Sequence, residues 1–336
     1  MKNSDNYIIN IADVEPLTRD LFIREGFDEA NASALARNIA LAEQYGSYSH
    51  GLFRLPGYLA SLKSGKVRGN ARPTVEQVTS AVIRVDGDSG YAPISHDVLV
   101  DPLIKTVHSS GVALAAVVNT HHFSALWIEV ERLARLGLIA IACTSYKPAM
   151  PAQGGRKPVF GTNPLAFACP REKGEPFVFD QASAMMARGD VMRAAEAGIL
   201  LSEGVGLGPD GVPTNDPRLI LKGCLLPFGG HKGASIALMV ELLAGPLIGE
   251  VLSIEAAARD QVDGGPPRGG EFILAFDPVK IRGDYNFPTH AEILFQEIAS
   301  DLNATLPGEG RMKRRNEVVK KGVTIPSRIM ALLQEK

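Results

Sequence analysis

The stretch Val112-Ala113-Leu114-Ala115-Ala116-Val117-Val118-Asn119 decides the fold class, because an almost unbroken apolar run predicts a strand buried on both faces. Thr120-His121-His122 follow it as a loop, and residues 123–136 have the length and pattern of a helix. A second buried strand is predicted over residues 138–144. A strand, a loop, a helix and another strand in this order build a sheet flanked by helices, so we expect an α/β chain.

More elements are predicted on both sides of this unit. Strands are expected over residues 80–85, 164–169, 177–179 and 272–276, and helices over residues 14–25, 28–43, 49–63, 94–109, 234–243, 287–302 and 326–334. Pro56 lies inside the third of these helices, so a kink or break is expected there. The charge-rich residues 309–321 are expected to form a solvated connector.

Composition excludes several classes of protein. The chain has 336 residues, 45% hydrophobic and 21% charged, which is ordinary for a globular protein. A net charge of −2 argues against a surface for nucleic acid or acidic membranes. The three cysteines form no CxxC pair, as is typical of a reducing cytoplasm. No signal peptide or apolar run of ~18 residues is visible, so we expect a cytoplasmic protein without a membrane span.

The most informative polar residues lie in Tyr48-Ser49-His50-Gly51-Leu52-Phe53-Arg54. Histidine has an ordinary pKa near ~6.5, so His50 can give or take a proton at neutral pH. On a helix Arg54 would share a face with His50, and its guanidinium suits a bidentate carboxylate. Ser49 adds a hydroxyl beside the imidazole. The alternative is a solvated helix face, whereas the functional interpretation is a small carboxylate substrate whose neighbouring atom gains or loses a proton.

Two glycine-rich stretches were candidates for binding phosphate. Gly206-Leu207-Gly208-Pro209-Asp210-Gly211 matches GxGxxG by letter, but residues 212–217 are unlike a helix, so we interpret the stretch as a surface turn. Phe228-Gly229-Gly230-His231-Lys232-Gly233 stands directly before a predicted helix. Free N–H groups at a helix start favour an anion there, while a tightly packed loop is the equal alternative.

The strand-to-helix junction at His121 and His122 is a favoured position for a ligand. Paired histidines suggest a metal, but no third ligand stands at a recognisable spacing, so we expect no metal site. Asp180 and Asp190 are candidates to orient His50 through a ring N–H, with surface exposure as the commoner fate of an aspartate.

Together these motifs resemble those of a known family. The shared motifs are Ser49-His50-Gly51 with Arg54, His121-His122-Phe123, Phe160-Gly161-Thr162-Asn163-Pro164, Asp180, Asp190 and Leu226-Pro227-Phe228-Gly229-Gly230-His231-Lys232-Gly233, in this order. They resemble the malate/L-lactate/L-sulfolactate dehydrogenase-like oxidoreductases, and the likeness covers about residues 15–325. Within that family the chain is most similar to reductases of Δ1-piperideine-2-carboxylate and Δ1-pyrroline-2-carboxylate.

The resemblance implies an L-sulfolactate dehydrogenase-like fold rather than a Rossmann fold. Such a fold has a large, mostly antiparallel mixed sheet with flanking helices, and a helical domain formed by both chain ends. We therefore expect a helical domain over residues 1–70, completed by about residues 285–336. Residues 71–118 are expected to serve the sheet and dimerisation, and residues 119–284 to bind NAD(P)H. The family also implies a homodimer.

The resemblance also assigns roles to residues. His50 would be the proton donor, with Ser49 and Asp190 as its relay partners, and Arg54 would hold the substrate carboxylate. Contacts to the cofactor would come from His122, Phe123, Ser124, Ala125, Leu126, Thr162, Asp180, Gln181, Ala182, His231 and Lys232. Relatives carry a basic residue directly after the acidic one in the Leu306-Pro307-Gly308-Glu309 segment, where it would meet the 2′-phosphate of NADPH. Here that residue is displaced to Arg311, so NADH stays possible beside NADPH.

The implied reaction is the reduction of a cyclic imine carboxylate. C2 accepts a hydride, the ring nitrogen accepts a proton from His50, and the product is an L-amino acid such as L-pipecolate or L-proline. A 2-oxo acid dehydrogenase of the same family would need nearly the same residues. A non-catalytic NADP-binding protein is a third possibility, against which the intact set of Ser49, His50, Arg54 and Asp190 speaks.

Overall fold

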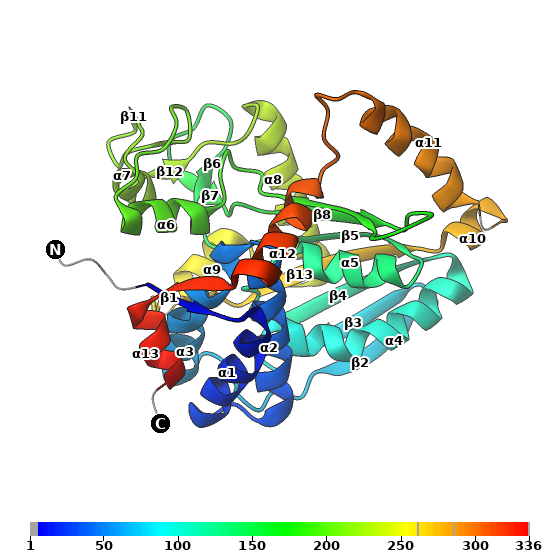
Figure 1. Cartoon of the computed structure of the whole chain (residues 1–336), viewed down its shortest axis with the longest axis horizontal. Coiled ribbons are helices and arrows are strands. Elements are labelled where there is room, and N and C mark those ends of the chain that lie inside the picture. Colours follow the sequence, from blue (N-terminus) through cyan, green and yellow to red (C-terminus); the bar gives the residue numbers. More distant parts are fainter. Residues whose placement is uncertain (1–5, 261, 285, 335–336) are drawn as a thin grey trace.

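The largest element of the chain is a seven-stranded sheet, seen in a computed structural model that describes residues 6–260, 262–284 and 286–334 (Figure 1). Its strands in spatial order are β2 (Thr74–Thr79), β3 (Val82–Asp86), β4 (Val112–Thr120), β13 (Gly269–Phe276), β5 (Ile139–Thr144), β8 (Leu165–Cys169) and β9 (Phe177–Gln181). Only β3 and β4 pair in parallel, and all other neighbours in this sheet are antiparallel. The mostly antiparallel mixed sheet that we expected is confirmed.

Strands β4 and β5 run in the same direction but are not neighbours. Strand β13 lies between them and pairs antiparallel with both, so that Phe272 faces Ala116 on one side and Cys143 on the other. The predicted strand–helix–strand unit is therefore confirmed, and a strand from much later in the chain completes it. Because β4 and β5 are parallel, their carboxyl ends meet at one edge of the sheet.

Helices cover both faces of the sheet. Helices α4 (Ala92–Ser110) and α5 (Trp127–Arg135) pack on one face, and α8 (His231–Ala244) packs on the other. Successive residues of β4 alternate between these two cores: Val117 packs with α4 and α5, and Val118 packs with α8. Burial on both faces explains why β4 is apolar along nearly its whole length.

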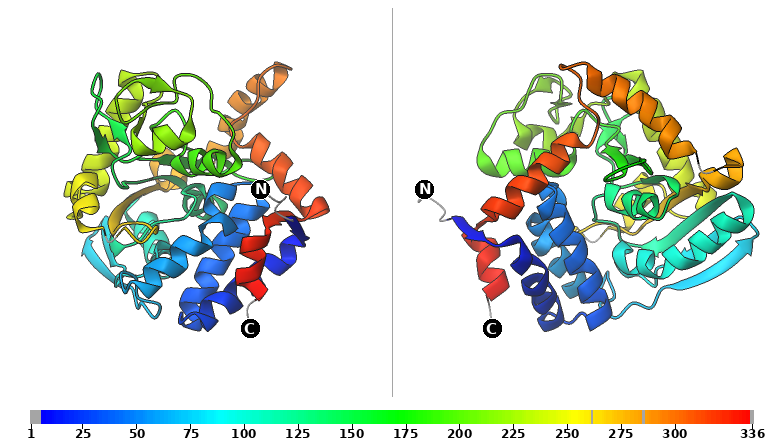
Figure 2. Two further views of the ribbon diagram at one scale, coloured as in Figure 1. Left: turned by 90° about the vertical axis from the view of Figure 1, so that its left-hand side faces the viewer. Right: turned by 45° about the vertical axis from the view of Figure 1, so that its right-hand side comes forward.

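Both ends of the chain meet on one side of the molecule (Figure 2). Strands β1 (Asn6–Ile9) and β14 (Val323–Pro326) pair antiparallel. Around them lie α1 (Ile11–Arg24), α2 (Glu29–Gln44), α3 (Leu55–Lys63), α12 (Glu309–Lys321) and α13 (Ser327–Gln334). Helix α11 (Phe287–Ser300) lies apart from this group. Its Phe295 stacks on Phe177 of β9, with 5.1 Å between the ring centres. The boundaries of the expected domains stay a prediction.

Smaller elements form a lobe beside the sheet. They are β6 (Met150–Pro151), β7 (Pro158–Phe160), α6 (Arg188–Ala197), β10 (Gly206–Leu207), β11 (Pro213–Thr214), α7 (Pro217–Lys222) and β12 (Cys224–Leu225). Short η3 (Pro246–Ile248), α9 (Ser253–Arg259) and α10 (Pro278–Arg282) connect larger elements. No helix follows the GxGxxG-like stretch directly, because β11 comes next. The expected surface turn is confirmed only for residues 208–211, where the N–H of Gly211 bonds the carbonyl of Gly208, whereas Gly206 and Leu207 are buried in β10.

The prediction of one helix over residues 49–63 is wrong. Two 3-10 turns, η1 (Tyr48–His50) and η2 (Leu52–Arg54), precede α3. Gly51 separates the turns with an extended backbone, at φ −91 and ψ −142. Pro56 stands in the first turn of α3, where a missing N–H removes no helical hydrogen bond.

The prediction of a solvated connector over residues 309–321 is also wrong, because these residues form α12. Most of its charged side chains are exposed, whereas Arg311 and Val318 are buried. Val318 packs in the core of the helices formed by both chain ends. Two buried residues are therefore enough to fix a helix whose other faces are almost entirely charged.

Helix α8 lies in an unusually apolar stretch, and the three cysteines are buried. Among the described residues, the window His231–Ile248 is long and apolar enough to cross a membrane by composition, although 44% of it is buried inside the protein. Its helix, α8, packs on β5 and β13, and buried core helices pass the same test. Cys143, Cys169 and Cys224 are free and buried.

Candidate active site

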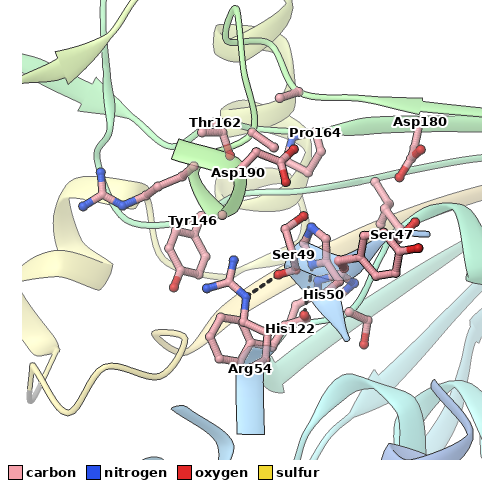
Figure 3. A pocket seen from close by; sticks show the side chains of 18 of the residues that line it. Ser47, Ser49, His50, Arg54, His122, Tyr146, Thr162, Pro164, Asp180 and Asp190 are labelled. Atoms are coloured by element: carbon pink, nitrogen blue, oxygen red, sulfur yellow. Dashed lines mark hydrogen bonds between the residues drawn. The ribbon is translucent and has the colours of Figure 1, made fainter. Parts of the chain in front are cut away.

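A cavity of about 500 Å³ lies at the edge where β4 and β5 end (Figure 3). Its walls come from the loops after these two strands, from the adjoining ends of β8 and β9, from η1 and η2, and from the start of α6. The antiparallel strand β8 begins at the same edge, so Thr162 and Pro164 enter the cavity from the segment before it. Its size is ordinary for a site that binds a small molecule.

His50 is held in the cavity wall by a contact to the backbone. Its Nδ1 lies 3.2 Å from the carbonyl oxygen of Phe123. A carbonyl only accepts, so Nδ1 carries the hydrogen and donates it, which leaves Nε2 as the nitrogen for chemistry. Burial, together with the positive charge of Arg54, lowers the pKa of His50 to about 3. The imidazole of the free chain is therefore neutral at pH 7.

Arg54 presents an unpaired cation to the same cavity. Its Nε donates to the carbonyl oxygen of Ser49 at 2.6 Å, and its guanidinium lies 4.5 Å from the centre of the Phe123 ring. No carboxylate is within ion-pair distance among the residues that the structure describes. Burial lowers the pKa of Arg54. A buried guanidinium without an acidic partner is a good site for a substrate carboxylate.

The start of α6 closes over these residues at Gly189. A Cβ atom at this position would lie 2.7 Å from Nη2 of Arg54 and 2.8 Å from Cβ of Ser49, so only glycine fits. Asp190, the next residue, lines the cavity and lies above Ser49 in Figure 3. In the described part of the chain no hydrogen bond joins Asp190 to His50 or Ser49. The relay through Ser49 and Asp190 stays a prediction.

Most of the expected cofactor residues line the cavity. The helix expected from residue 123 begins only at Trp127, so residues 123–126 form a loop. This loop and the strand ends bring His122, Phe123, Ser124, Leu126, Thr162, Asp180, Gln181 and Ala182 into the cavity wall. Ala125 is the exception in the loop, because it is buried in the main core.

Three expected cofactor residues lie outside the cavity wall. His231 and Lys232 are exposed in the first turn of α8, after Gly229 and Gly230, which both have positive φ. Arg311 is buried, with its guanidinium 4.4 Å from the centre of the Trp127 ring and Nη2 donating to the carbonyl oxygen of Val178 at 3.1 Å. The roles of these three residues in binding the cofactor stay predictions.

Sequence reasoning missed several residues of the cavity. Tyr146, Lys147 and Arg188 enter it, as does Arg314 from α12. Tyr146 and Lys147 follow the carboxyl end of the buried strand β5, which was a usable signal because such ends are favoured ligand positions. No signal identified Arg314, since α12 was expected to be a connector.

A buried glutamate supports the turns that carry His50 and Arg54. Oε1 of Glu43 on α2 accepts the backbone N–H of Leu52 at 2.7 Å, and a Cβ at Gly51 would collide with this carboxyl group. Glu43 is only 3% exposed, and burial raises its pKa from 4.5 to about 7. The folded protein therefore favours the neutral form of Glu43 near neutral pH.

Replacing Glu43 by glutamine is expected to change how stability depends on pH. A carboxyl group with a raised pKa contributes stability below pH 4.5 that is lost as the pH rises toward about 7. Glutamine keeps the acceptor oxygen but does not titrate. The unfolding free energy of Glu43→Gln minus that of the wild type should thus grow by up to about 1.4 kcal/mol per pH unit in this range. Urea unfolding at several pH values measures the difference.

The matched control is Glu29→Gln, which changes an exposed glutamate on the same helix. Its stability relative to the wild type should show no such dependence on pH. A constant difference between Glu43→Gln and the wild type across this range would show that Glu43 does not titrate there.

Comparisons with known proteins agree with this fold. The family model described as malate/L-lactate dehydrogenase matches residues 9–334. Δ1-Pyrroline-2-carboxylate reductase of Ancylobacter novellus is 40% identical over 329 residues, covering 97% of this chain and 96% of that protein. The crystal structure of Δ1-piperideine-2-carboxylate reductase from Pseudomonas syringae pv. tomato matches with a TM-score of 0.92 at 40% identity, covering 98% of this chain and 99% of that one.

A further relative differs in its named substrate. It is (2R)-3-sulfolactate dehydrogenase (NADP(+)) of Chromohalobacter salexigens, which is 39% identical over 310 residues. The match covers 92% of this chain and 92% of that protein. The matched family and these relatives are dehydrogenases and reductases that use a nicotinamide cofactor. The chain belongs to the malate/L-lactate dehydrogenase family.

Proposed function

We propose that this protein reduces the cyclic imines Δ1-piperideine-2-carboxylate and Δ1-pyrroline-2-carboxylate to L-pipecolate and L-proline in the cytoplasm. The observation that carries the proposal is the unpaired guanidinium of Arg54 beside the imidazole of His50 in one cavity. These are the two groups that a 2-carboxylate and a ring nitrogen in need of a proton require. The relatives named for imine reduction, at 40% identity over nearly the whole chain, support the same substrate class.

In this proposal Arg54 binds the substrate carboxylate and so fixes which face of C2 receives the hydride. Nε2 of His50 carries the proton for the ring nitrogen. The free imidazole is neutral, and the charge of Arg54 is one cause of its low pKa. A carboxylate bound to Arg54 offsets that charge, so substrate binding raises the pKa of His50 and promotes its protonation. Asp190 and Ser49 complete the proposed proton relay from the other side of the cavity.

The cavity suits a nicotinamide cofactor. Polar side chains of His122, Thr162 and Asp180 line it together with the loop formed by residues 123–126, and it opens to solvent next to the exposed Arg314. These residues would hold the cofactor, which supplies the hydride when it is bound. The hydride and proton together reduce the C=N bond without any metal.

We infer that NADPH is the preferred cofactor and that Arg314 contacts its 2′-phosphate. Arg311 is buried against Trp127, whereas Arg314 is exposed, lines the cavity and has no acidic partner among the described residues. Charge-assisted hydrogen bonds contribute about 1.5–3 kcal/mol. Arg314→Ala is therefore expected to raise KM for NADPH by about 10- to 150-fold while KM for NADH stays unchanged, as measured by initial rates.

Lys313→Ala is the control, because Lys313 is an exposed cation on the same helix outside the cavity wall. An equal rise of both KM values in Arg314→Ala would exclude a contact to the 2′-phosphate.

We also propose that the protein is a homodimer and that α8 contributes to the interface. Leu238, Met239 and Leu242 are exposed on α8, and Leu247 continues the apolar patch in η3. Contiguous exposed apolar residues of this kind are typical of an interface between subunits. Light scattering after size exclusion should give twice the chain mass for the wild type and less for Leu242→Glu. A wild-type monomer would refute the proposal.

The assay that tests the proposed function follows the oxidation of NADPH by absorbance. The two imines are compared with pyruvate, oxaloacetate and sulfopyruvate, since a relative at 39% identity is named for a sulfolactate. Turnover of the imines with kcat/KM well above that of every oxo acid is the expected result. A preference for an oxo acid would keep the site but make the enzyme a hydroxy-acid dehydrogenase. No turnover of any substrate would favour a protein that only binds the cofactor.

A further inference from the structure

Four buried titratable side chains form a connected cluster below the cavity. Nε2 of His96 on α4 lies 2.6 Å from Oε2 of Glu271 on β13, and its Nδ1 lies 3.5 Å from Oε1 of Glu129 on α5. The same Oε1 atom is 2.8 Å from Nε2 of His122, in the loop after β4. Glu271 is fully buried, and the other three side chains are at most 9% exposed. The proposed reaction assigns no proton transfer to this cluster.

Two carboxyl oxygens of the cluster have no hydrogen-bond donor among the described residues, from which we infer a shared proton. Oε2 of Glu129 and Oε1 of Glu271 are both buried and without a hydrogen-bond donor. Two carboxylates only accept hydrogen bonds, so a proton shared between these oxygens pairs both. Burial and the negative charge of Glu271 raise the pKa of Glu129 well above its ordinary value, while the positive charge of His96 is the main factor that lowers the pKa of Glu271. Burial lowers the pKa of His96, but the negative charges of Glu129 and Glu271 outweigh burial and raise it.

The cluster also connects two cavities. His122 lines the active-site cavity, where it lies close enough to His50 to lower the pKa of that residue. His96 and Glu129 line a second cavity of about 410 Å³ between α2, α4 and α5. Asp97 and Arg132 stand at this second cavity and are partly exposed to solvent. Water in the second cavity therefore has access to one end of the cluster, and the active site to the other end.

We propose that His96, Glu129, Glu271 and His122 form an internal proton relay that supplies the active site from the second cavity. The inference rests on the proposed function, because reduction consumes one proton in each turnover. Bound NADPH and substrate would fill the mouth of the active site, and Nδ1 of His50 is held by the carbonyl of Phe123. A path through the interior returns a proton to the site without opening that mouth.

The transfers balance over one turnover. Nδ1 of His96 gives a proton to Oε1 of Glu129 while the shared proton shifts from Oε2 of Glu129 to Glu271. The ring of His122, whose Nε2 carries the hydrogen in the resting cluster, turns to give that proton to Nε2 of His50 and turns back. Nε2 of His122 then takes the proton from Oε1 of Glu129, and the shared proton returns to Glu129. Water in the second cavity reprotonates His96. One proton enters, one leaves, and the cluster is unchanged.

Other titratable groups also act on the cluster. They are Cys143 of β5, whose thiol pKa is raised by burial and by Glu271, Asp180 of β9, which raises the pKa of Glu129, and His50 of η1, which is coupled to His122. Asp180 and His50 belong to the active site. Cys143 lines neither of the two cavities, so it does not connect the cluster to them.

Glu129→Gln is the main test, because an amide keeps the size and hydrogen bonds of the side chain but does not pass a proton on. Because His50 is neutral until the substrate binds, the first turnover needs the relay as every later one does, and it should slow down in a stopped-flow experiment while the Tm stays unchanged. Steady-state turnover should fall at least about 10-fold, as expected for lost general-acid function, and its solvent isotope effect should rise. The Kd for NADPH should not change. A slow first turnover with a lowered Tm would instead indicate a structural role and overturn the proposal.

His96→Ala gives an independent test. The substitution leaves space in the second cavity, so added imidazole should restore steady-state turnover. The rate restored by other buffers should follow the order of their pKa values. Asp97→Asn is the control, since Asp97 lines the same cavity without belonging to the relay. An unchanged rate in both Glu129→Gln and His96→Ala would refute the relay.

Two measurements separate this inference from the proposed reaction. Histidine-labelled NMR of the wild type reports the protonation of His96 without any substrate, and His96 should be an imidazolium at pH 7. A neutral His96 would overturn the relay, even if the imines are reduced, while failure of all substrates with a charged His96 would overturn only the reaction. Stoichiometric zinc that chelators remove together with activity would show that His96, Glu129 and Glu271 hold a metal instead, since their ligand atoms lie within 4.8 Å of one another.

Discussion

Replacing Arg54 by alanine is expected to lower kcat/KM for the imine by about 30- to 5,000-fold, which corresponds to about 2–5 kcal/mol of transition-state binding. The guanidinium is a buried cation beside His50 without an acidic partner among the described residues, and truncation leaves the substrate carboxylate unpaired there. The effect should fall mainly on KM, because the carboxylate is bound in both the ground state and the transition state. Initial rates over a range of imine concentrations measure both constants.

The design must separate binding from folding, because Nε of Arg54 also holds the carbonyl of Ser49. Tm and the Kd for NADPH are therefore measured beside the rates. Arg54→Lys keeps the charge without the planar fork and should recover only part of the loss. Arg218→Ala, which removes an exposed arginine of α7 outside the cavity wall, is the control for charge. An unchanged kcat/KM in Arg54→Ala would refute the carboxylate site.

Replacing His50 by alanine is expected to lower kcat by about 100- to 10,000-fold, the range typical of a lost general acid. Binding of NADPH and of the imine should persist, because neither depends on the Nε2 proton. Equilibrium titration of cofactor fluorescence measures the first, and inhibition by a saturated cyclic amino acid in the wild type and the variant measures the second.

The pH dependence gives the sign of the proton transfer. If His50 must be protonated and substrate binding raises its pKa from about 3, then kcat/KM for imine reduction in the wild type should fall as the pH rises. This dependence should be absent in His50→Ala. His108→Gln changes an exposed histidine of α4 and is the control. A wild-type kcat in His50→Ala would show that the proton comes from another group.

The sequence allowed those parts of the fold to be predicted that have an unbroken pattern. Strands β4 and β5 were found because both faces are buried, which makes them apolar throughout. The strand between them, β13, was predicted as a strand, but its place was not, because nothing local to residues 269–276 encodes a partner so far away in the chain. The α2 cap was also predictable, since Asp28 accepts the N–H of Asn31 at 3.0 Å.

The sequence allowed the residues of the candidate site to be predicted, but not the contacts that hold them in place. His50 and Arg54 were found from residue type, but the helical spacing that was expected to bring them together does not exist, because Gly51 splits the segment. The carbonyl of Phe123, which fixes the tautomer of His50, carries no signal in its side chain. Likewise, whether Arg311 or Arg314 faces the cavity depends on the orientation of α12, which the charge-rich sequence does not indicate.

The pairing of β1 with β14 has a consequence for biosynthesis. The ribosome makes Ser49, His50 and Arg54 long before α12, β14 and α13, which pack with the helices around these residues. Because domains are completed only when their distant segments have left the exit tunnel, the nascent chain carries catalytic side chains without a finished scaffold. Catalysis should therefore begin only after β14 and α13 have emerged, and a chain cut short before residue 323 should lack activity even though every proposed catalytic residue is present.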